Sequence, residues 1–140
     1  MERDDATLAG VALGGYRLRS ERGPLGLVLA ATGSEVALAM GAAERLERPD
    51  FGVRVVSLPC VERLLAQPAS FRAALLPRGV PTLGIEAGHP MGLAGVLGPG
   101  AEVHGISTFG ESAPGPELMK HFGFTVDAVV AHARELVQER

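Results

Sequence analysis

Residues 25–31 (LGLVLAA) are followed directly by residues 32–35 (TGSE), and this junction decides the fold. A continuous apolar run of that length, beginning near a glycine turn, is typical of a strand buried on both faces of a parallel sheet. Thr32 and Glu35 have the spacing of a capping box, which predicts that a helix begins immediately after the strand. The expected helix carries an apolar stripe at helical spacing, formed by Val36, Ala39, Met40, Ala43 and Leu46.

Further strand signals recur along the chain. Residues 53–58 (VRVVSL) and 81–87 (PTLGIEA) predict two more parallel strands, and residues 103–106 (VHGI) predict a short last one. Residues 16–19 (YRLR) alternate between uncharged and charged side chains, which favours an edge strand.

Helix signals stand between and after these strands. Ser70 is expected to cap a helix that runs through Leu76, and the long Gly/Pro-rich loop at 88–100 is expected to hold one short helical turn. Pro116 and Gly123 bracket a later helix, because proline favours the first helical position and glycine the position after the last. Thr125 then caps the final helix.

The alternation of strands and helices predicts an α/β fold. We expect a three-layer α/β/α sandwich with right-handed crossovers and a mostly parallel sheet of about five strands, with an antiparallel edge strand. Residues 14–140 are expected to form one domain, and the polar residues 1–13 are expected to be a frayed N-terminal tail.

Composition excludes several classes of protein. The chain has 140 residues, 46% of them hydrophobic, and a formal net charge of −3. That charge, with no basic stripe, predicts no role in nucleic-acid binding. No apolar run approaches the roughly 18 residues of a membrane span, so no membrane association is expected. Cys60 is the only cysteine, which excludes an internal disulfide and favours a reducing, cytoplasmic setting.

The turn after the first long strand is a candidate anion site. Thr32, Gly33 and Ser34 lie where free backbone N–H groups and a helix dipole can bind a phosphate. The loop has neither a dinucleotide-binding pattern nor a Walker pattern, and it lacks a lysine. Glu35 already places a negative charge on the same helix end, so a structural cap is favoured over an anion site.

The carboxyl edge of the sheet is the second candidate, because open α/β folds place their ligands there. Glu86, Gly88 and His89 leave the strand at 81–87, and the loop at 108–114 follows the last strand. Glu86 with Glu111, or Glu86 with His89, would form an acid/base pair if the loops meet. Packing at an interface is the favoured alternative, and it also involves the loop residues Phe109 and Ser112.

No other cluster predicts chemistry. The four histidines lack metal-ligand spacing, and with a single cysteine a zinc site is not expected. Ser34 and Ser112 lack the flanking glycines of a nucleophile elbow. The residues taken alone therefore predict an α/β domain without a self-sufficient active site.

Several motifs of the chain together resemble the C-terminal domain of transketolases. They stand in the order and spacing of that family and cover the chain from near Gly14 to its end. The motifs are ATGSEV at 31–36, VRVVSLP at 53–59, EAG at 86–88, TFGESAP at 108–114 and FGFT at 122–125.

The resemblance implies a role in ketol transfer between sugar phosphates of the pentose phosphate pathway. Transketolases use thiamine diphosphate and a divalent metal such as Mg²⁺, and two upstream domains hold both across a dimer interface. None of the ligating motifs of those domains occurs in this chain. The resemblance therefore implies no catalytic, cofactor-binding or metal-binding residue here, and it names the remaining transketolase domains or subunit as the partner.

Two functions remain open. The first is a non-catalytic module that stabilises a larger transketolase dimer through its sheet edge and glycine-rich loops. The second is a stand-alone domain that binds a small ligand or nucleotide at the turn of residues 32–35. A homodimer of the chain is also open, because a missing partner domain leaves apolar surface exposed.

Overall fold

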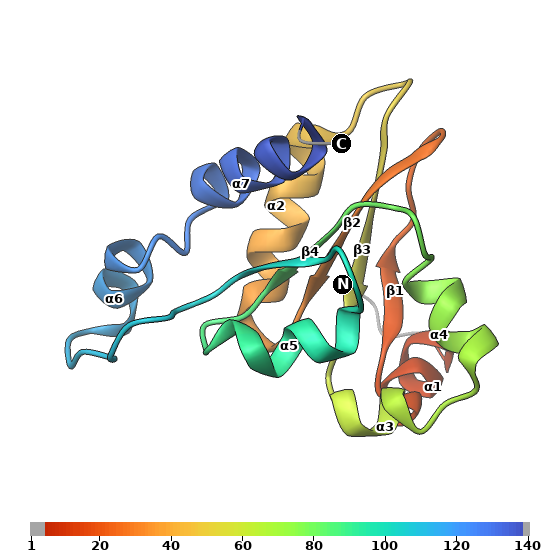
Figure 1. Ribbon diagram of the computed structural model, residues 1–140, viewed down its shortest axis with the longest axis horizontal. Coiled ribbons are helices and arrows are strands. Elements are labelled where there is room, and N and C mark those ends of the chain that lie inside the picture. Colours follow the sequence, from red (N-terminus) through yellow and green to blue (C-terminus); the bar gives the residue numbers. More distant parts are fainter. Residues whose placement is uncertain (1–4, 139–140) are drawn as a thin grey trace.

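The computed structural model describes residues 5–138, and a five-stranded sheet forms its centre (Figure 1). The sheet has the order β1-β3-β2-β4-β5. β1 pairs antiparallel with β3, whereas the other neighbouring strands are parallel. The prediction of a mostly parallel sheet with an antiparallel edge strand is therefore confirmed. The strands are β1 (Tyr16–Arg19), β2 (Leu25–Ala31), β3 (Gly52–Ser57), β4 (Thr82–Ile85) and β5 (Glu102–His104).

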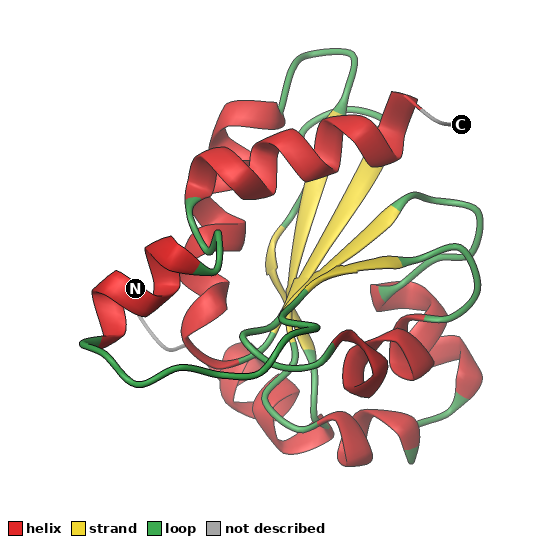
Figure 2. Cartoon of the chain, turned by 60° about the vertical axis from the view of Figure 1, so that its left-hand side comes forward, coloured by secondary structure: helices red, strands yellow, loops and turns green. Residues whose placement is uncertain are grey.

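Helices cover both faces of the sheet, which confirms the predicted three-layer sandwich (Figure 2). α2 (Val36–Leu46) and α7 (Val126–Gln138) bury their apolar sides in a cluster that includes Leu27 and Leu29 of β2. α3 (Val61–Leu65), α4 (Ala69–Leu75) and α5 (Pro90–Leu97) contribute to a second cluster, which includes Val28 and Ala30 of the same strand. Since successive side chains of a strand point to opposite faces, the unbroken apolar run of β2 supplies both layers.

The N-terminal stretch differs from its expected structure. Residues 1–4 lie outside the described part, but α1 (Asp5–Leu13) is a helix where a frayed tail was predicted. Tertiary contacts account for the helix: Gly10 is buried beneath the Tyr16 ring, and an Nη atom of Arg63 donates to the Ala12 carbonyl at 3.3 Å. The second contact joins residues that are 51 positions apart in sequence, and local polarity does not reveal it.

Three other helix boundaries also differ from the prediction. α4 begins at Ala69 after Pro68, so Ser70 lies inside the helix and does not cap it. The loop at 88–100 holds α5, an eight-residue helix, where one turn was expected. α6 (Gly115–His121) begins one residue before Pro116.

The ends of the last two helices confirm the remaining signals. Gly123 follows α6 with a φ of +79°, a conformation that side chains with a Cβ rarely adopt. Thr125 caps α7, because its Oγ1 accepts a hydrogen bond of 3.2 Å from the Ala128 N–H. Within residues 5–138, no helix is long and apolar enough to cross a membrane.

One charged side chain is buried between the sheet and its second layer. Arg54 lies on β3 with its side chain 8% exposed. Its guanidinium donates to both carboxylate oxygens of Glu21, at 2.9 and 2.5 Å. It also donates to the carbonyls of Ala74 and Leu75 at 2.9 and 3.2 Å. Arg54 therefore ties the loop between β1 and β2 to the end of α4.

Candidate functional site

The predicted capping box at the β2–α2 junction does not form. Residues Gly33–Glu35 wind into a single 3₁₀ turn, and the Thr32 side chain makes no capping bond. The N–H of Thr32 donates to the carbonyl of Ile85 at 3.4 Å, so it already has an acceptor in the neighbouring strand. The carboxylate of Glu35 instead accepts the Ser34 hydroxyl at 2.6 Å. The capping-box prediction is wrong because the N–H of Thr32 is bonded to the Ile85 carbonyl and is not available to the Glu35 carboxylate.

This geometry bears on the anion site predicted at Thr32, Gly33 and Ser34. Glu35 is only 6% exposed and lies at the amino end of α2. Its carboxylate already accepts the Ser34 hydroxyl, which a bound phosphate would need as a donor. A negative group at a helix amino end stabilises the helix and repels a second anion. The anion site stays a prediction, and the local charge is unfavourable to it.

The carboxyl ends of β4 and β5 are held together closely. The Glu86 N–H donates to the His104 carbonyl at 3.2 Å, and the Ile106 N–H donates to the Gly88 carbonyl at 2.8 Å. A Cβ added at Gly105 would lie 2.8 Å from that same Gly88 oxygen. Glycine at 105 therefore permits the two strand ends to approach each other.

The two acid/base pairs considered from the sequence are not formed. His89 serves as the cap of α5, because its Nδ1 accepts the Met91 N–H at 3.2 Å. Glu111 lies 3.5 Å from Nε2 of His121, and both side chains are more than half exposed. Among residues 5–138, no hydrogen bond or ion pair joins Glu86 to either partner. Phe109 and Ser112 are exposed in the same loop.

A chain of polar contacts that the sequence did not predict links β5 to α7. Nδ1 of His104 lies 3.2 Å from Nδ1 of His132, and Nε2 of His132 lies 2.8 Å from the Glu102 carboxylate. At the other end, Nε2 of His104 lies 3.0 Å from the Gly123 carbonyl. The residues stand far apart in sequence, and no spacing rule joins them.

The partners determine how this chain is protonated. The Gly123 carbonyl and the Glu102 carboxylate only accept, so each facing Nε2 must carry a hydrogen. A bond between the two Nδ1 atoms then needs one further hydrogen, which makes one ring a cation. Burial lowers the pKa of His104 below 6.5 despite the Gly123 bond, and the neighbouring His132 lowers it further. Burial therefore favours the neutral form of the His104 ring.

A cavity of about 700 Å³ lies away from all of these residues, at the amino ends of β4 and β5. None of the site residues predicted from the sequence lines it. Sequence patterns point to carboxyl ends of strands, and this cavity forms at the opposite edge.

Comparisons with known proteins agree with the fold and with the motifs. Residues 14–125 match the family described as the transketolase-like TK C-terminal domain. A chromosomal transketolase of Cupriavidus necator is 47% identical over 138 residues, which are 99% of this chain and 20% of that protein. The structure of a transketolase from Leishmania mexicana superposes with a TM-score of 0.85 and 42% identity, over 99% of this chain and 20% of that one.

A more distant structure shares the fold alone. It is described as a split-gene transketolase in an inactive β4 tetramer, with a TM-score of 0.57 and 20% identity. This chain covers 42% of that one, with 89% of its own residues aligned. The chain spans about a fifth of the length of the Cupriavidus necator and Leishmania mexicana transketolases.

Proposed function

Because the chain belongs to the transketolase family and corresponds to its C-terminal domain, we propose that it serves assembly and does not catalyse ketol transfer alone. In this proposal the remaining transketolase domains, or a separate subunit that contains them, are its partner. The complete enzyme transfers a ketol unit between sugar phosphates, and this chain supplies support for an active site formed elsewhere. A cytoplasmic setting belongs to the same proposal.

One surface feature carries the proposal. Every residue from 107 to 117 is exposed, and α6, which follows, has no buried residue. This segment, which we call the arm (residues 107–121), extends away from the sheet beside α5 (Figure 1). Phe109 lies on it with 97% of its surface exposed. Met119 of α6 packs against the core, whereas Phe109 has no such packing, and we take the exposed part of the arm around Phe109 as the surface that a partner domain covers.

The residues of the chain do not fit the cofactors of the complete enzyme. Within the described range, no group of three or more His, Cys, Asp or Glu side chains is arranged to hold a metal ion. The turn most suited to a diphosphate carries the buried carboxylate of Glu35. In this proposal the partner domains hold thiamine diphosphate and its divalent metal, and this chain carries no catalytic step.

A stand-alone ligand-binding domain was the alternative function, with its site at Thr32, Gly33 and Ser34. The charge of Glu35 at that turn speaks against it. The proposal also includes association of this chain with copies of itself. An exposed arm without its partner domain favours contacts between copies, and we expect homo-oligomers of the isolated chain at high concentration.

The test is reconstitution. The purified chain is assayed for ketol transfer with thiamine diphosphate and Mg²⁺, alone and mixed with a Cupriavidus necator transketolase truncated before its last 138 residues. We expect no turnover from the chain alone. In the mixture we expect a complex by light scattering and a higher turnover or a higher melting temperature of the truncated protein.

The arm is tested in the same mixture with two variants. Phe109→Asp should weaken the complex at least tenfold, whereas Ala131→Asp, which places the same charge on the exposed face of α7, should not. Turnover by the purified chain alone would refute the non-catalytic assignment. Equal complex formation by both variants would exclude the arm as the interface.

A further inference from the structure

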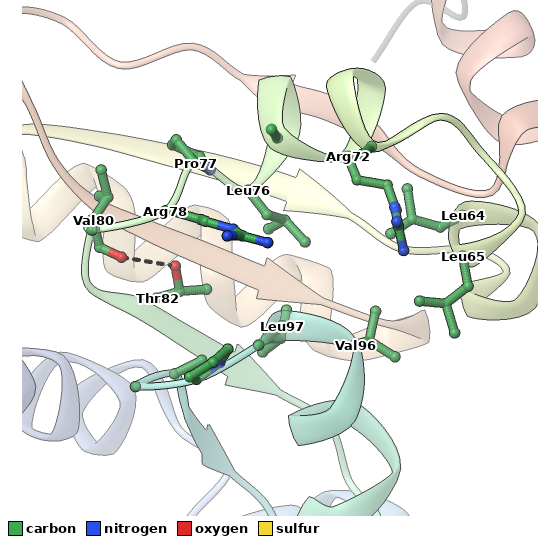
Figure 3. Close-up of a pocket in the computed structure, with 17 residues that line it drawn as sticks. Leu64, Leu65, Arg72, Leu76, Pro77, Arg78, Val80, Thr82, Val96 and Leu97 are labelled. Carbon is green, nitrogen blue, oxygen red and sulfur yellow. Dashed lines mark hydrogen bonds between the residues drawn. The ribbon is translucent and has the colours of Figure 1, made fainter.

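The cavity at the amino edge of the sheet has the size of a ligand site. It opens between α4 and the end of α5, above the first residue of β4, Thr82 (Figure 3). Its volume of about 700 Å³ falls within the range of small-molecule pockets, roughly 300 to 1,000 Å³. Gly79 and Gly98 border it, and an added Cβ at either would meet no atom within 4 Å.

The charge of its lining is positive, although the chain as a whole carries −3. Arg72 on α4 and Arg78 in the loop before β4 are the charged residues of the lining, which contains no aspartate or glutamate. Both side chains project into the space between α4 and Leu97 (Figure 3). The cavity therefore presents two cations that no carboxylate of the lining neutralises.

Neither arginine is used to hold the fold. Across residues 5–138, no hydrogen bond or ion pair is found for the guanidinium group of Arg72 or of Arg78, and Arg72 bonds only through its backbone. Arg54 shows the contrast, because its guanidinium donates to Glu21 and to two carbonyls at the end of α4. Guanidinium groups left without acceptors are the groups that bind phosphate oxygens in paired hydrogen bonds.

Apart from Thr82, whose hydroxyl donates to the Val80 carbonyl, the other side chains of the lining are apolar. Leucine and valine side chains from α3, α5, the residue after α4 and the loop before β4 surround the two arginines and form an apolar wall (Figure 3). A sugar phosphate or a free phosphate would leave this wall in contact with water. A ligand with a flat apolar ring covers it and places its phosphate at the cations. The wall consists of Leu64, Leu65, Leu76, Val80, Val96 and Leu97.

We propose that this cavity binds a phosphate monoester that carries a flat aromatic ring with apolar faces, which is the chemistry of a nucleoside monophosphate. Arg72 and Arg78 hold the phosphate, and the leucine and valine wall takes the base. A phosphate monoester carries a charge of about −1.5 to −2 at pH 7, which two guanidinium groups balance. No residue of the arm lines this site.

Isothermal titration calorimetry of the 140-residue chain at pH 7.5 tests the proposal, with adenosine 5′-monophosphate as the probe. Adenosine, inorganic phosphate and ribose 5-phosphate supply the ring, the anion and the sugar phosphate separately. We expect the complete nucleotide to bind at least tenfold more tightly than any of the three. Equal binding of inorganic phosphate, or no binding of the nucleotide at millimolar concentration, overturns the proposal.

Variants locate the site. Arg72→Gln and Arg78→Gln should each raise the Kd at least tenfold, while Arg134→Gln, on the exposed face of α7, should leave it unchanged. Amide chemical-shift changes on titration should cluster at Gly79 and Gly98 and be absent at Gly33. Shifts centred at Gly33, or one Kd shared by all three variants, would overturn the assignment.

Discussion

Replacing Glu21 with glutamine should destabilise the chain strongly at neutral pH. Hydrogen bonds from Arg54 lower the pKa of the Glu21 carboxyl from 4.5 to about 2, although burial opposes the change. Because a tenfold change in proton affinity corresponds to about 1.4 kcal/mol, this ionised carboxylate stabilises the folded state by about 3 kcal/mol. Removing one partner of a buried ion pair lowers the free energy of unfolding by a similar amount, about 3 to 5 kcal/mol.

The pH dependence follows from the same values. A carboxyl whose pKa is lower in the folded state stabilises fully above 4.5, and that contribution is lost as pH falls from 4.5 to about 2. The glutamine side chain of Glu21→Gln does not titrate between pH 4.5 and 2. The wild-type chain and the variant should therefore differ by about 3 kcal/mol at pH 7 and converge as the pH approaches 2.

Urea unfolding followed by far-ultraviolet circular dichroism measures both effects, since the chain has no tryptophan to report by fluorescence. Asp50→Asn is the matched control, because Asp50 lies 3.8 Å from Arg48 with both side chains more than half exposed. It should change the free energy of unfolding by less than about 0.5 kcal/mol. A Glu21→Gln effect under about 1 kcal/mol at pH 7, or one that persists unchanged at low pH, would refute the reasoning.

Three further predictions concern the backbone, the histidine contacts and a helix cap. Gly14→Ala should lower the free energy of unfolding by more than about 3 kcal/mol, because at φ +90° its Cβ would lie 2.4 Å from the Cys60 carbonyl oxygen. Gly79→Ala is the control, since Gly79 has a φ of +82° and open space around it, and it should lower the free energy of unfolding by only about 1 kcal/mol. Thermal unfolding measures both variants. Burial lowers the pKa of His104, so the unfolded chain binds more protons below pH 6.5 and stability falls as pH drops through that range. Urea titrations between pH 8 and 5 should show a smaller fall for His104→Gln, and an identical fall would contradict this assignment. Thr125→Ala removes the Oγ1 acceptor of the Ala128 N–H and should lower the free energy of unfolding by about 1 kcal/mol. An unchanged free energy of unfolding would contradict the capping role of Thr125.

Local patterns predicted those elements whose cause is local. The apolar runs at β2 and β3 indicated buried parallel strands, and alternation at 16–19 indicated the antiparallel edge. Gly123 and Thr125 marked helix ends because their effects act within a few residues. Predictions failed where a distant partner decided the outcome. The capping box did not form because the Ile85 carbonyl of β4 accepts the N–H of Thr32 that Glu35 needed, and α1 is held by Arg63, which donates to the Ala12 carbonyl.

Among the polar residues, too, some were predictable from local sequence and others only from the tertiary structure. Motifs at 31–36, 108–114 and 122–125 indicated the family from sequence alone, and the comparisons show that membership. No spacing rule joins Arg54 to Glu21 or His104 to His132, because only the packing of strands and helices brings each pair together.

The sequence by itself therefore determined the α/β class, the mostly parallel sheet with its antiparallel edge strand, and the family, since hydrophobic periodicity and short motifs are properties of neighbouring residues. The tertiary structure alone decided which charges are paired, which are left open in a cavity, and which segment stands exposed as the arm. Those outcomes depend on where distant segments meet, and the free energy of a charge depends on its surroundings in space rather than on its place in the chain.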